Sequence, residues 1–208
     1  MPRGLFFVIE GIDCAGKSTL VEGLVDHLMD QYEPAISLKF PCKDTASFHL
    51  LDKYIRKEIE LDDRTAHLLF ATNRSEMQHF INNTLQEGVH VICDRYIASG
   101  IAYSYTCGKL EWDWLVKLEK DIVQPDYVFL LDINTHQCLQ RRNEFGEDRF
   151  DNVEKLEMIR KNYLRLFNPL SWYVVNANQS KENVLYKTIQ IIMECIKLKS
   201  KSNKSFSF

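Results

Sequence analysis

The sequence predicts an α/β fold, in which a five-stranded parallel sheet lies between layers of helices. Five short apolar runs, rich in β-branched and aromatic residues, have the length and composition of buried parallel strands. Amphipathic helical patterns separate these runs, as in chains that build parallel sheets from β–α–β units. The five predicted strands are Leu5–Ile9, Ala35–Phe40, Val89–Cys93, Tyr127–Ile133 and Trp172–Val175.

A helix follows the first predicted strand and the loop after it. Leucines recur at steps of four beyond Ser18, which places them on one face of a helix. They are Leu20, Leu24 and Leu28. Pro34 ends this helix before the second predicted strand.

The later elements also carry start and stop signals. One long helix is predicted from about Asp63 to Glu87, and Gly88 ends it. Pro125-Asp126 marks the turn into the fourth predicted strand. The last residues, Lys197–Phe208, are rich in lysine and serine, and we expect them to fray.

Length, charge and cysteine content narrow the class of protein. The chain has 208 residues, which suits one domain over residues 1–208, and a formal net charge of −3. That charge argues against a large nucleic-acid-binding surface. No apolar run approaches the roughly 20 residues of a membrane helix. We therefore expect no nucleic-acid partner, because of the charge, and no membrane partner, because of the short apolar runs.

The six cysteines are scattered without a C-x-x-C pair, which favours a reducing compartment over a disulfide framework or a zinc site. The first predicted strand begins too early to leave room for a signal or transit segment. We therefore expect a cytoplasmic protein. The basic C-terminal tail leaves entry into the nucleus open.

A glycine-rich loop follows the first predicted strand. Residues Gly11–Ser18 read G-x-x-x-x-G-K-S, the pattern of a P-loop, whose backbone N–H groups surround phosphates. Lys17 can reach the β- and γ-phosphates, and the Ser18 hydroxyl can bind Mg²⁺. The alternative is an ordinary glycine-rich turn, but a strand before it and a helix after it favour a nucleoside triphosphate site. The expected ATP contacts are Gly11, Ile12, Asp13, Cys14, Ala15, Gly16, Lys17, Ser18 and Thr19.

A carboxylate ends the third predicted strand. In proteins with such a loop, an acidic residue at the place of Asp94 holds Mg²⁺ or its water opposite Ser18. Ser18 and Asp94 are therefore the predicted metal ligands. Arg95 follows directly and is placed for bidentate phosphate binding. Its alternative role is to pair with Asp94 alone.

Phe70 and Arg74 lie four residues apart in the predicted long helix and share one face of it. The ring could stack on a base, and the guanidinium could bond the base edge. Because arginine has only donors, it would favour the O4 of thymine or uracil over the amine of cytosine. The alternative is a core phenylalanine beside a solvated arginine.

The segment from about residue 140 to 150 is dense in charge. A solvated loop is the default interpretation of such a run. Phosphoryl transfer, however, needs cations around the transition state, and a lid that closes over the site often supplies them. We therefore expect a short lid here, with Arg141, Arg142 and Arg149 as candidate catalytic residues.

Together these features resemble the thymidylate kinases of the nucleoside monophosphate kinase superfamily. The resemblance spans Leu5 to about Ile196 and rests on five segments in the same order. They are Glu10–Asp13 with the loop, Phe40-Pro41, Leu68–Arg74, Asp94–Tyr96 with Ser99-Gly100 and Tyr103, and Asp148–Phe150. It implies that a homodimer transfers the γ-phosphoryl group of ATP to dTMP with Mg²⁺, giving dTDP for dTTP synthesis.

The resemblance also implies roles for single residues. Phe70 would stack on thymine, Arg74 would bond its O4, and Arg95 would hold the dTMP phosphate. Asp13 would lie near the 3′-hydroxyl, and Tyr103 would exclude a 2′-hydroxyl. The expected dTMP-binding residues are Asp13, Phe40, Lys43, Ile55, Phe70, Arg74, Arg95, Ser99, Gly100, Tyr103 and Phe150. The expected catalytic residues are Lys17, Asp13, Arg95, Arg141, Arg142 and Arg149.

Three positions depart from the family pattern. Lys43 and Phe150 stand where relatives often have arginine and tyrosine. Cys14 stands where many eukaryotic members carry an arginine in the loop. Bacterial members without that arginine tend to place one in the lid, where this chain has Glu144. Which of the three lid arginines takes over its role is left open.

Two other functions compete with this one. A deoxynucleoside kinase would share the phosphate-binding loop, but its neutral acceptor has no phosphate for Arg95 and Lys43 to bind. A degenerate kinase that serves as a nucleotide-binding scaffold is favoured by Cys14 alone. The intact Lys17 and Asp94 oppose it.

Overall fold

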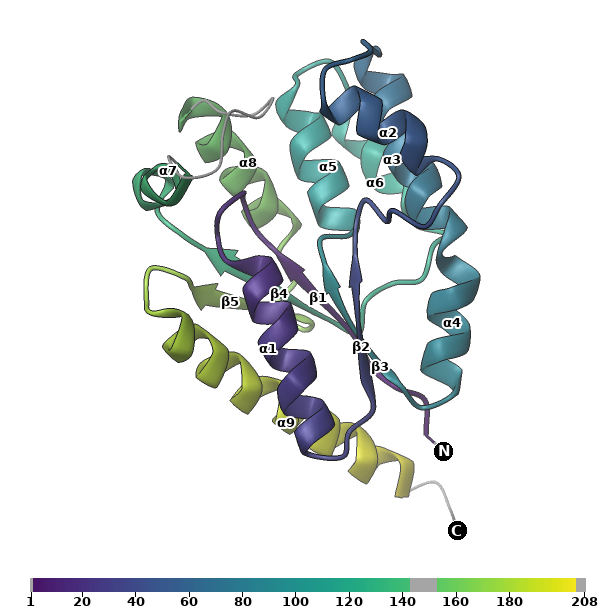
Figure 1. Ribbon diagram of the computed structural model, residues 1–208, viewed down its shortest axis with the longest axis vertical. Coiled ribbons are helices and arrows are strands. Elements are labelled where there is room, and N and C mark those ends of the chain that lie inside the picture. The colour runs from purple at the N-terminus through teal and green to yellow at the C-terminus, as the bar shows by residue number, and fades with distance from the viewer. Residues whose placement is uncertain (1, 143–152, 205–208) are drawn as a thin grey trace.

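The computed structural model describes residues 2–142 and 153–204, including side chains for all of these except residues 139–142 and 202–204 (Figure 1). It contains one five-stranded sheet in the order β2-β3-β1-β4-β5, in which every neighbouring pair is parallel. The predicted α/β fold is confirmed, and each predicted strand is correct to within one residue at either end. The strands are β1 (Phe6–Glu10), β2 (Ala35–Lys39), β3 (His90–Asp94), β4 (Tyr127–Asp132) and β5 (Trp172–Asn176).

Helices cover both faces of this sheet (Figure 1). Helices α1 (Lys17–Asp30) and α9 (Lys181–Lys204) lie on one face, and α4 (Gln78–Gln86), α5 (Ile97–Thr106) and α8 (Val153–Leu166) lie on the other. The remaining helices lie near the carboxyl ends of the strands. They are α2 (Phe48–Ile55), α3 (Asp63–Glu76), α6 (Trp112–Leu118) and α7 (Thr135–Arg142).

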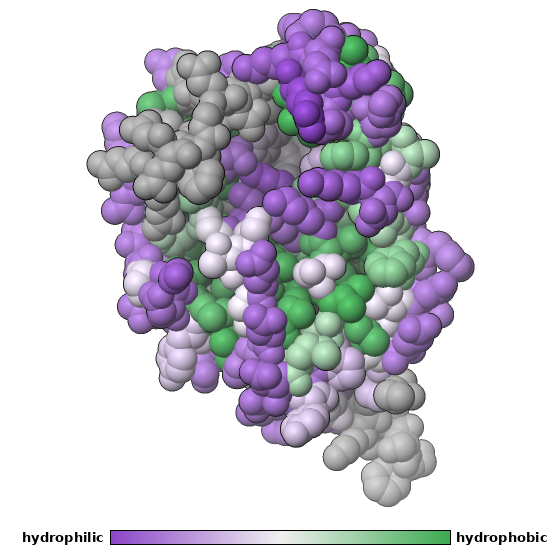
Figure 2. Space-filling view, in the orientation of Figure 1, coloured by the Kyte–Doolittle hydropathy of each residue, from purple (hydrophilic) through white to green (hydrophobic). Residues whose placement is uncertain are grey.

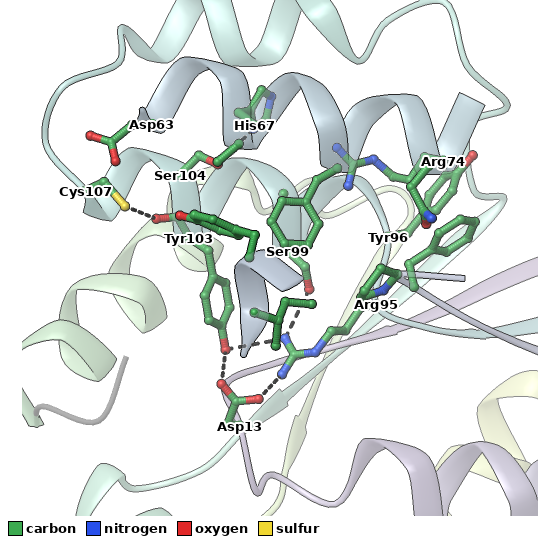
Figure 3. A pocket seen from close by; sticks show the side chains of 18 residues that line it. Asp13, Asp63, His67, Arg74, Arg95, Tyr96, Ser99, Tyr103, Ser104 and Cys107 are labelled. Atoms are coloured by element: carbon green, nitrogen blue, oxygen red, sulfur yellow. Dashed lines mark hydrogen bonds and ion pairs between the residues drawn. The ribbon is translucent and has the colours of Figure 1, made fainter. Parts of the chain in front are cut away.

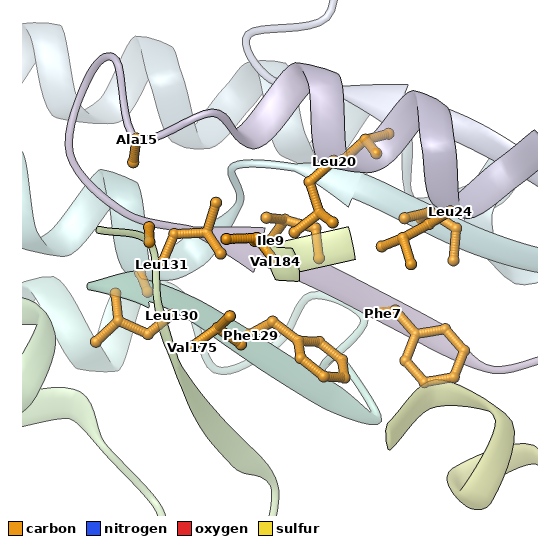
Figure 4. Packing of buried hydrophobic residues seen from close by; sticks show 14 of the residues in the cluster. Phe7, Ile9, Ala15, Leu20, Leu24, Phe129, Leu130, Leu131, Val175 and Val184 are labelled. Atoms are coloured by element: carbon orange, nitrogen blue, oxygen red, sulfur yellow. The ribbon is translucent and has the colours of Figure 1, made fainter. Parts of the chain in front are cut away.

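The central strands are buried on both faces, which is why their sequences read as continuous apolar runs. On one face, Ile9 of β1 packs with Leu20 of α1 (Figure 4). On the other, Phe6 of β1 packs with Ile81 of α4. Alternation along β1 thus directs successive side chains into two apolar layers, and these layers fix the loop that follows the strand.

The predicted single helix from Asp63 to Glu87 is wrong, because it is divided at Met77 into α3 and α4. The backbone carbonyl of Arg74 accepts hydrogen bonds from the Met77 N–H at 3.3 Å and from the side-chain amide of Gln78 at 2.6 Å. In an unbroken helix that carbonyl would accept the backbone N–H of Gln78. Neither glycine nor proline marks the break.

Two other predicted boundaries also need correction. Helix α9 continues to Lys204, so most of the segment expected to fray is helical. The Lys199 ammonium donates to the carbonyl of Gly4 at 3.3 Å, which holds this part of the helix against the chain's first residues. The segment expected to be a lid loop from about residue 140 begins inside α7, which ends at Arg142.

Candidate active site

A cavity of about 190 Å³ lies beyond the carboxyl ends of β1 and β3 (Figure 3). The loop after β1 and helices α2, α3 and α5 contribute to its walls. Nine of the predicted dTMP-binding residues line it: Asp13, Phe40, Ile55, Phe70, Arg74, Arg95, Ser99, Gly100 and Tyr103. Lys43 is exposed in the loop after β2, and Phe150 lies outside the described residues.

One end of this cavity is built around the Arg95 guanidinium. It pairs with the carboxylate of Asp13 and also donates to the Ser99 hydroxyl at 3.3 Å (Figure 3). The Tyr103 hydroxyl donates to the other oxygen of Asp13 at 2.8 Å. Arg95 thus pairs with Asp13 across the cavity, and the alternative in which it serves Asp94 alone is wrong.

The charges at this end are buried and mutually compensated. Burial on its own would lower the pKa of Arg95, but Asp13 and the other acidic groups around it together outweigh that effect and raise the pKa well above the ordinary value. Burial also raises the pKa of the Tyr103 hydroxyl, which therefore stays protonated as a donor. The arrangement presents a permanent cation that a phosphate dianion could share with Asp13.

Glu10 anchors the start of helix α5, which forms part of this end of the cavity. Its buried carboxylate accepts the backbone N–H groups of Tyr96 and Ser99 at 3.0 and 3.1 Å, at the start of α5. Burial raises the pKa of Glu10. Because Glu10 ends β1, its bonds tie the strand before the glycine-rich loop to the helix that carries Ser99 and Tyr103.

Phe70 and Arg74 also line the cavity, and Figure 3 shows Arg74 at the opposite side from Asp13. Arg74 is only 3% exposed, and its guanidinium pairs with the buried carboxylate of Glu119. The alternative of a solvated arginine is therefore wrong. Phe70 is half-buried in the wall, with the ring of Tyr54 edge-on at 6.4 Å between centroids.

The glycine-rich loop has the backbone that its sequence predicts. Gly11 has a φ of 144°, and a Cβ there would lie 2.8 Å from the carbonyl oxygen of Leu131, so only glycine fits. The Lys17 ammonium lies inside the loop and donates to the carbonyl of Ile12 at 2.7 Å. Burial, and then the charge of Arg95, lower the pKa of Lys17 to about 8.

Ser18 and Asp94 meet at the carboxyl end of β3. The Ser18 hydroxyl donates to one carboxylate oxygen of Asp94 at 2.5 Å. The other oxygen is buried and accepts no hydrogen bond from any described residue. The Lys39 ammonium lies 3.1 Å from the Ser18 hydroxyl and 3.4 Å from Asp94. These oxygen donors suit Mg²⁺, and the nearby lysine indicates that the place attracts a cation.

The family follows from the sequence as a whole. The pattern that describes the thymidylate kinase family matches residues 9–188. The thymidylate kinase of Schizosaccharomyces pombe is 35% identical over 195 residues, which cover 91% of this chain and 92% of that protein. The chain belongs to the thymidylate kinase family.

Other relatives agree with this assignment. The human thymidylate kinase is 32% identical over 194 residues, covering 92% of this chain and 91% of that protein. The structure of the thymidylate kinase from Candida albicans aligns with a TM-score of 0.84 at 27% identity, covering 92% of each chain. The resemblance inferred from five short segments is therefore confirmed over nearly the whole length.

A second hollow lies beside the loop of this thymidylate kinase family member. Four of the residues expected to contact ATP line it: Cys14, Ala15, Gly16 and Thr19. Its other walls come from Gln137 in α7 and from the segment around Asn178–Lys181 between β5 and α9. This hollow and the cavity lined by Arg74 and Arg95 thus approach the glycine-rich loop from two directions.

The sequence patterns predict no role for four charged or titratable residues of the site: Glu10, Lys39, His67 and Glu119. Glu10 belongs to the family segment before the loop, which was a usable signal. In the sequence, Lys39 looks like any exposed residue of an edge strand, so it gives no functional signal. Glu119 lies in a charged run 45 residues from Arg74, and no spacing rule connects the two.

The candidate lid arginines lie at or beyond the edge of the described residues. Arg141 and Arg142 are the last residues of α7, and their side chains are not described. Arg149 lies outside the described residues, as does Glu144. The question of which arginine replaces the one missing at Cys14 therefore passes to experiment.

Among the described residues, no helix combines the length and the hydropathy that a membrane span requires.

Proposed function

We propose that this chain transfers the γ-phosphoryl group of ATP to dTMP, giving dTDP. The observation that carries the proposal is one cavity with two differently equipped parts, directly beside a phosphate-binding loop. One part offers the Arg95 cation, and the other offers the Phe70 ring and the Arg74 guanidinium. A molecule that satisfies both parts carries a phosphate and a base with a carbonyl acceptor.

At the phosphate end, Arg95 holds the acceptor phosphate of dTMP and keeps its oxygens aimed at the loop. Asp13 then accepts a hydrogen bond from the 3′-hydroxyl of the sugar. The Tyr103 ring lies beside Asp13 and contacts the sugar, where a 2′-hydroxyl would find no room and no acceptor of its own. Removing water from this end strengthens each of these charged contacts.

At the base end, Phe70 stacks on the thymine ring and Arg74 donates to its O4. Cytosine presents an amine there, which would meet a donor with another donor. Phe40 and Ile55 complete the apolar walls. The base is thus selected by one hydrogen-bond donor inside an apolar slot.

On the donor side, the loop from Gly11 to Thr19 binds the ATP phosphates, and Lys17 moves from Ile12 to the β- and γ-phosphates. Ser18 and Asp94 would hold Mg²⁺. When bound, Mg²⁺ neutralises part of the negative charge on the transferring group. Arginines of the segment from Arg141 to Arg149 supply further positive charge and replace the arginine absent at Cys14.

We also propose a homodimer in a reducing, cytoplasmic compartment. Figure 2 shows apolar side chains gathered between α1 and α4, over the edge strand β2. Strand β2 carries the half-buried Ile36 and Leu38, and Phe80 of α4 is 46% exposed. A second copy would cover such a surface. Light scattering after size exclusion is expected to give twice the mass of one chain, and a single-chain mass at micromolar concentration would contradict the dimer.

An ADP-release assay with Mg²⁺ and ATP tests the proposed reaction. The acceptors are dTMP, dUMP, dCMP and thymidine, each offered separately. We expect rapid turnover with dTMP, slower turnover with dUMP, and little with dCMP or thymidine. Turnover with thymidine but not dTMP would indicate a deoxynucleoside kinase. ATP binding without turnover on any acceptor would indicate a scaffold.

A further inference from the structure

Glu119 pairs with Arg74 at the base end of the cavity, although Glu119 is not among the predicted site residues. Its side chain is 1% exposed, and its two carboxylate oxygens accept from two different nitrogens of Arg74. Nε donates to one oxygen at 3.1 Å, and Nη2 donates to the other. A bidentate pair of this kind fixes both the position and the plane of a guanidinium.

The backbone around Glu119 is itself anchored. Helix α6 ends just before it, and Leu115 of that helix is fully buried. The side-chain amide of Gln124 donates to the carbonyl of Glu119 at 2.9 Å and also to that of Ile122 at 2.9 Å. The backbone of Glu119 is thus held in place, so its carboxylate can orient the Arg74 guanidinium.

The bidentate pair uses two of the five N–H groups of Arg74 and neither of the two on Nη1. Within the described part of the chain, Nη1 donates to no acceptor. Arg74 lines the cavity, and its guanidinium passes over Gly100 of α5. A Cβ at Gly100 would lie 2.7 Å from Nη2 and 3.0 Å from Nη1, so glycine is what lets the group occupy this place.

His67 also lies near Glu119, but it does not compete with Arg74 for the negative charge of this carboxylate. Its Nε2 lies 3.7 Å from Glu119, and its Nδ1 forms a hydrogen bond with the Ser104 hydroxyl at 2.8 Å. Burial, and then the charge of Arg74, lower the pKa of His67 to about 4. The imidazole is therefore neutral in the working range of pH, and the negative charge of Glu119 is balanced by Arg74.

We propose that Glu119 is a positioning residue for base selection, which holds Arg74 so that Nη1 faces the O4 of the pyrimidine. The inference rests on the proposed function, because it assigns Arg74 to the base of the acceptor. Without the carboxylate, Nε and Nη2 lose their partners and the guanidinium can turn. It then donates from several directions, and the distinction between O4 of thymine and N4 of cytosine weakens.

Glu119→Gln tests this directly, because it keeps the shape of the side chain and replaces one acceptor by a donor. Binding of dTMP and dCMP to the full chain is measured by calorimetry, with dCMP read by competition if it binds weakly. We expect dTMP to bind about 10- to 100-fold more weakly, since charge-assisted bonds of Arg74 are lost. We also expect the ratio of dTMP to dCMP affinity to fall by about tenfold or more.

Asp121→Asn is the matched control, because Asp121 is an exposed carboxylate two residues away. It should leave both affinities unchanged. Glu119→Asp keeps the charge but withdraws the carboxylate by one methylene, and an intermediate loss of selectivity is expected. This second variant tests the inference even if Glu119→Gln does not fold, which far-ultraviolet circular dichroism reports.

The outcomes separate the inference from the proposed function. A fall in the affinity ratio supports the positioning role. Equal weakening of dTMP and dCMP, or no change in either, would overturn it and leave Glu119 with a structural role alone. Turnover of dTMP by the wild-type chain is measured beside these variants. Its absence would contradict the proposed reaction while the binding ratio still decides the role of Glu119.

Discussion

Lys17 illustrates how a single buried residue can link protonation to nucleotide binding. Its ammonium is enclosed by the glycine-rich loop, donates to Ile12 and has a pKa of about 8. A triphosphate places several negative charges beside it and raises that pKa again. Above pH 8, where the unbound lysine is largely neutral, ATP binding must therefore take up a proton.

Calorimetry checks this coupling. ATP is titrated at pH 8.5 in two buffers of different ionisation enthalpy, and uptake of roughly half a proton or more per ATP is expected. In Lys17→Arg the side chain stays charged at this pH, so the uptake should disappear. The same uptake in both proteins would show that another group titrates.

Lys17→Ala should abolish phosphoryl transfer while the fold persists.

His67 couples pH to stability instead. Because burial lowers its pKa in the folded state to about 4, against about 6.5 in an unfolded chain, only the unfolded chain takes up a proton as the pH falls below 6.5. Stability is therefore lost as the pH falls from 6.5 towards 4. Between pH 7.5 and 5.0 this one residue is expected to remove about 2 kcal/mol from the free energy of unfolding.

Urea unfolding of His67→Gln at the two pH values measures that contribution. The variant should lose less stability on acidification than the wild type, by about 2 kcal/mol. His49→Gln serves as the control, because His49 is exposed, and it should follow the wild type. Identical acid sensitivity in the wild type and His67→Gln would contradict the low pKa of His67.

At the scale of elements, the last turns of helix α3 shape the cavity on two sides. Arg74 lines the cavity, and Asn73 beside it is fully buried and faces the loop after β2. The Asn73 side chain accepts the N–H of Cys42 at 2.7 Å and donates to the carbonyl of the same residue at 3.0 Å. Phe40 and Pro41, which line the cavity, directly precede this contact.

Asn73→Ala should therefore loosen the loop and the wall that it supports. The N–H of Cys42 loses its acceptor, while the Cys42 carbonyl keeps only the hydrogen bond from the Thr45 hydroxyl. We expect the free energy of unfolding to fall by about 2–3 kcal/mol. Faster amide exchange across residues 42–47 and a raised KM for dTMP should accompany this. Asn82→Ala, at an exposed position of α4, should change stability by less than about 0.5 kcal/mol. Unchanged exchange in residues 42–47 would show that Asn73 does not hold the loop.

The elements also show which structural features the sequence predicts. Strands were predictable because burial on both faces requires continuous apolar runs. The division between α3 and α4 was not, because it depends on the Gln78 side chain reaching the carbonyl of Arg74. The helical end of α9 was missed because lysine and serine suggested fraying, although lysine is a good helix former.

At the scale of the whole molecule, the candidate site combines residues from segments far apart in the chain. The family segments predicted most of the cavity lining, including Asp13, Arg74 and Arg95. They did not predict Glu119 or His67, because these residues act through tertiary contacts and carry no pattern of their own. Sequence therefore predicts the groups that meet the ligand better than the groups that orient them.

In the proposed function one cavity holds the whole of dTMP, with its phosphate at Arg95 and its base at Arg74. A crystal structure of the full chain with dTMP tests this most directly. We expect thymine stacked on Phe70, its O4 within hydrogen-bond distance of Arg74 Nη1, and the phosphate of dTMP on Arg95. A dTMP molecule bound elsewhere, or bound here with its base at Arg95, would contradict it.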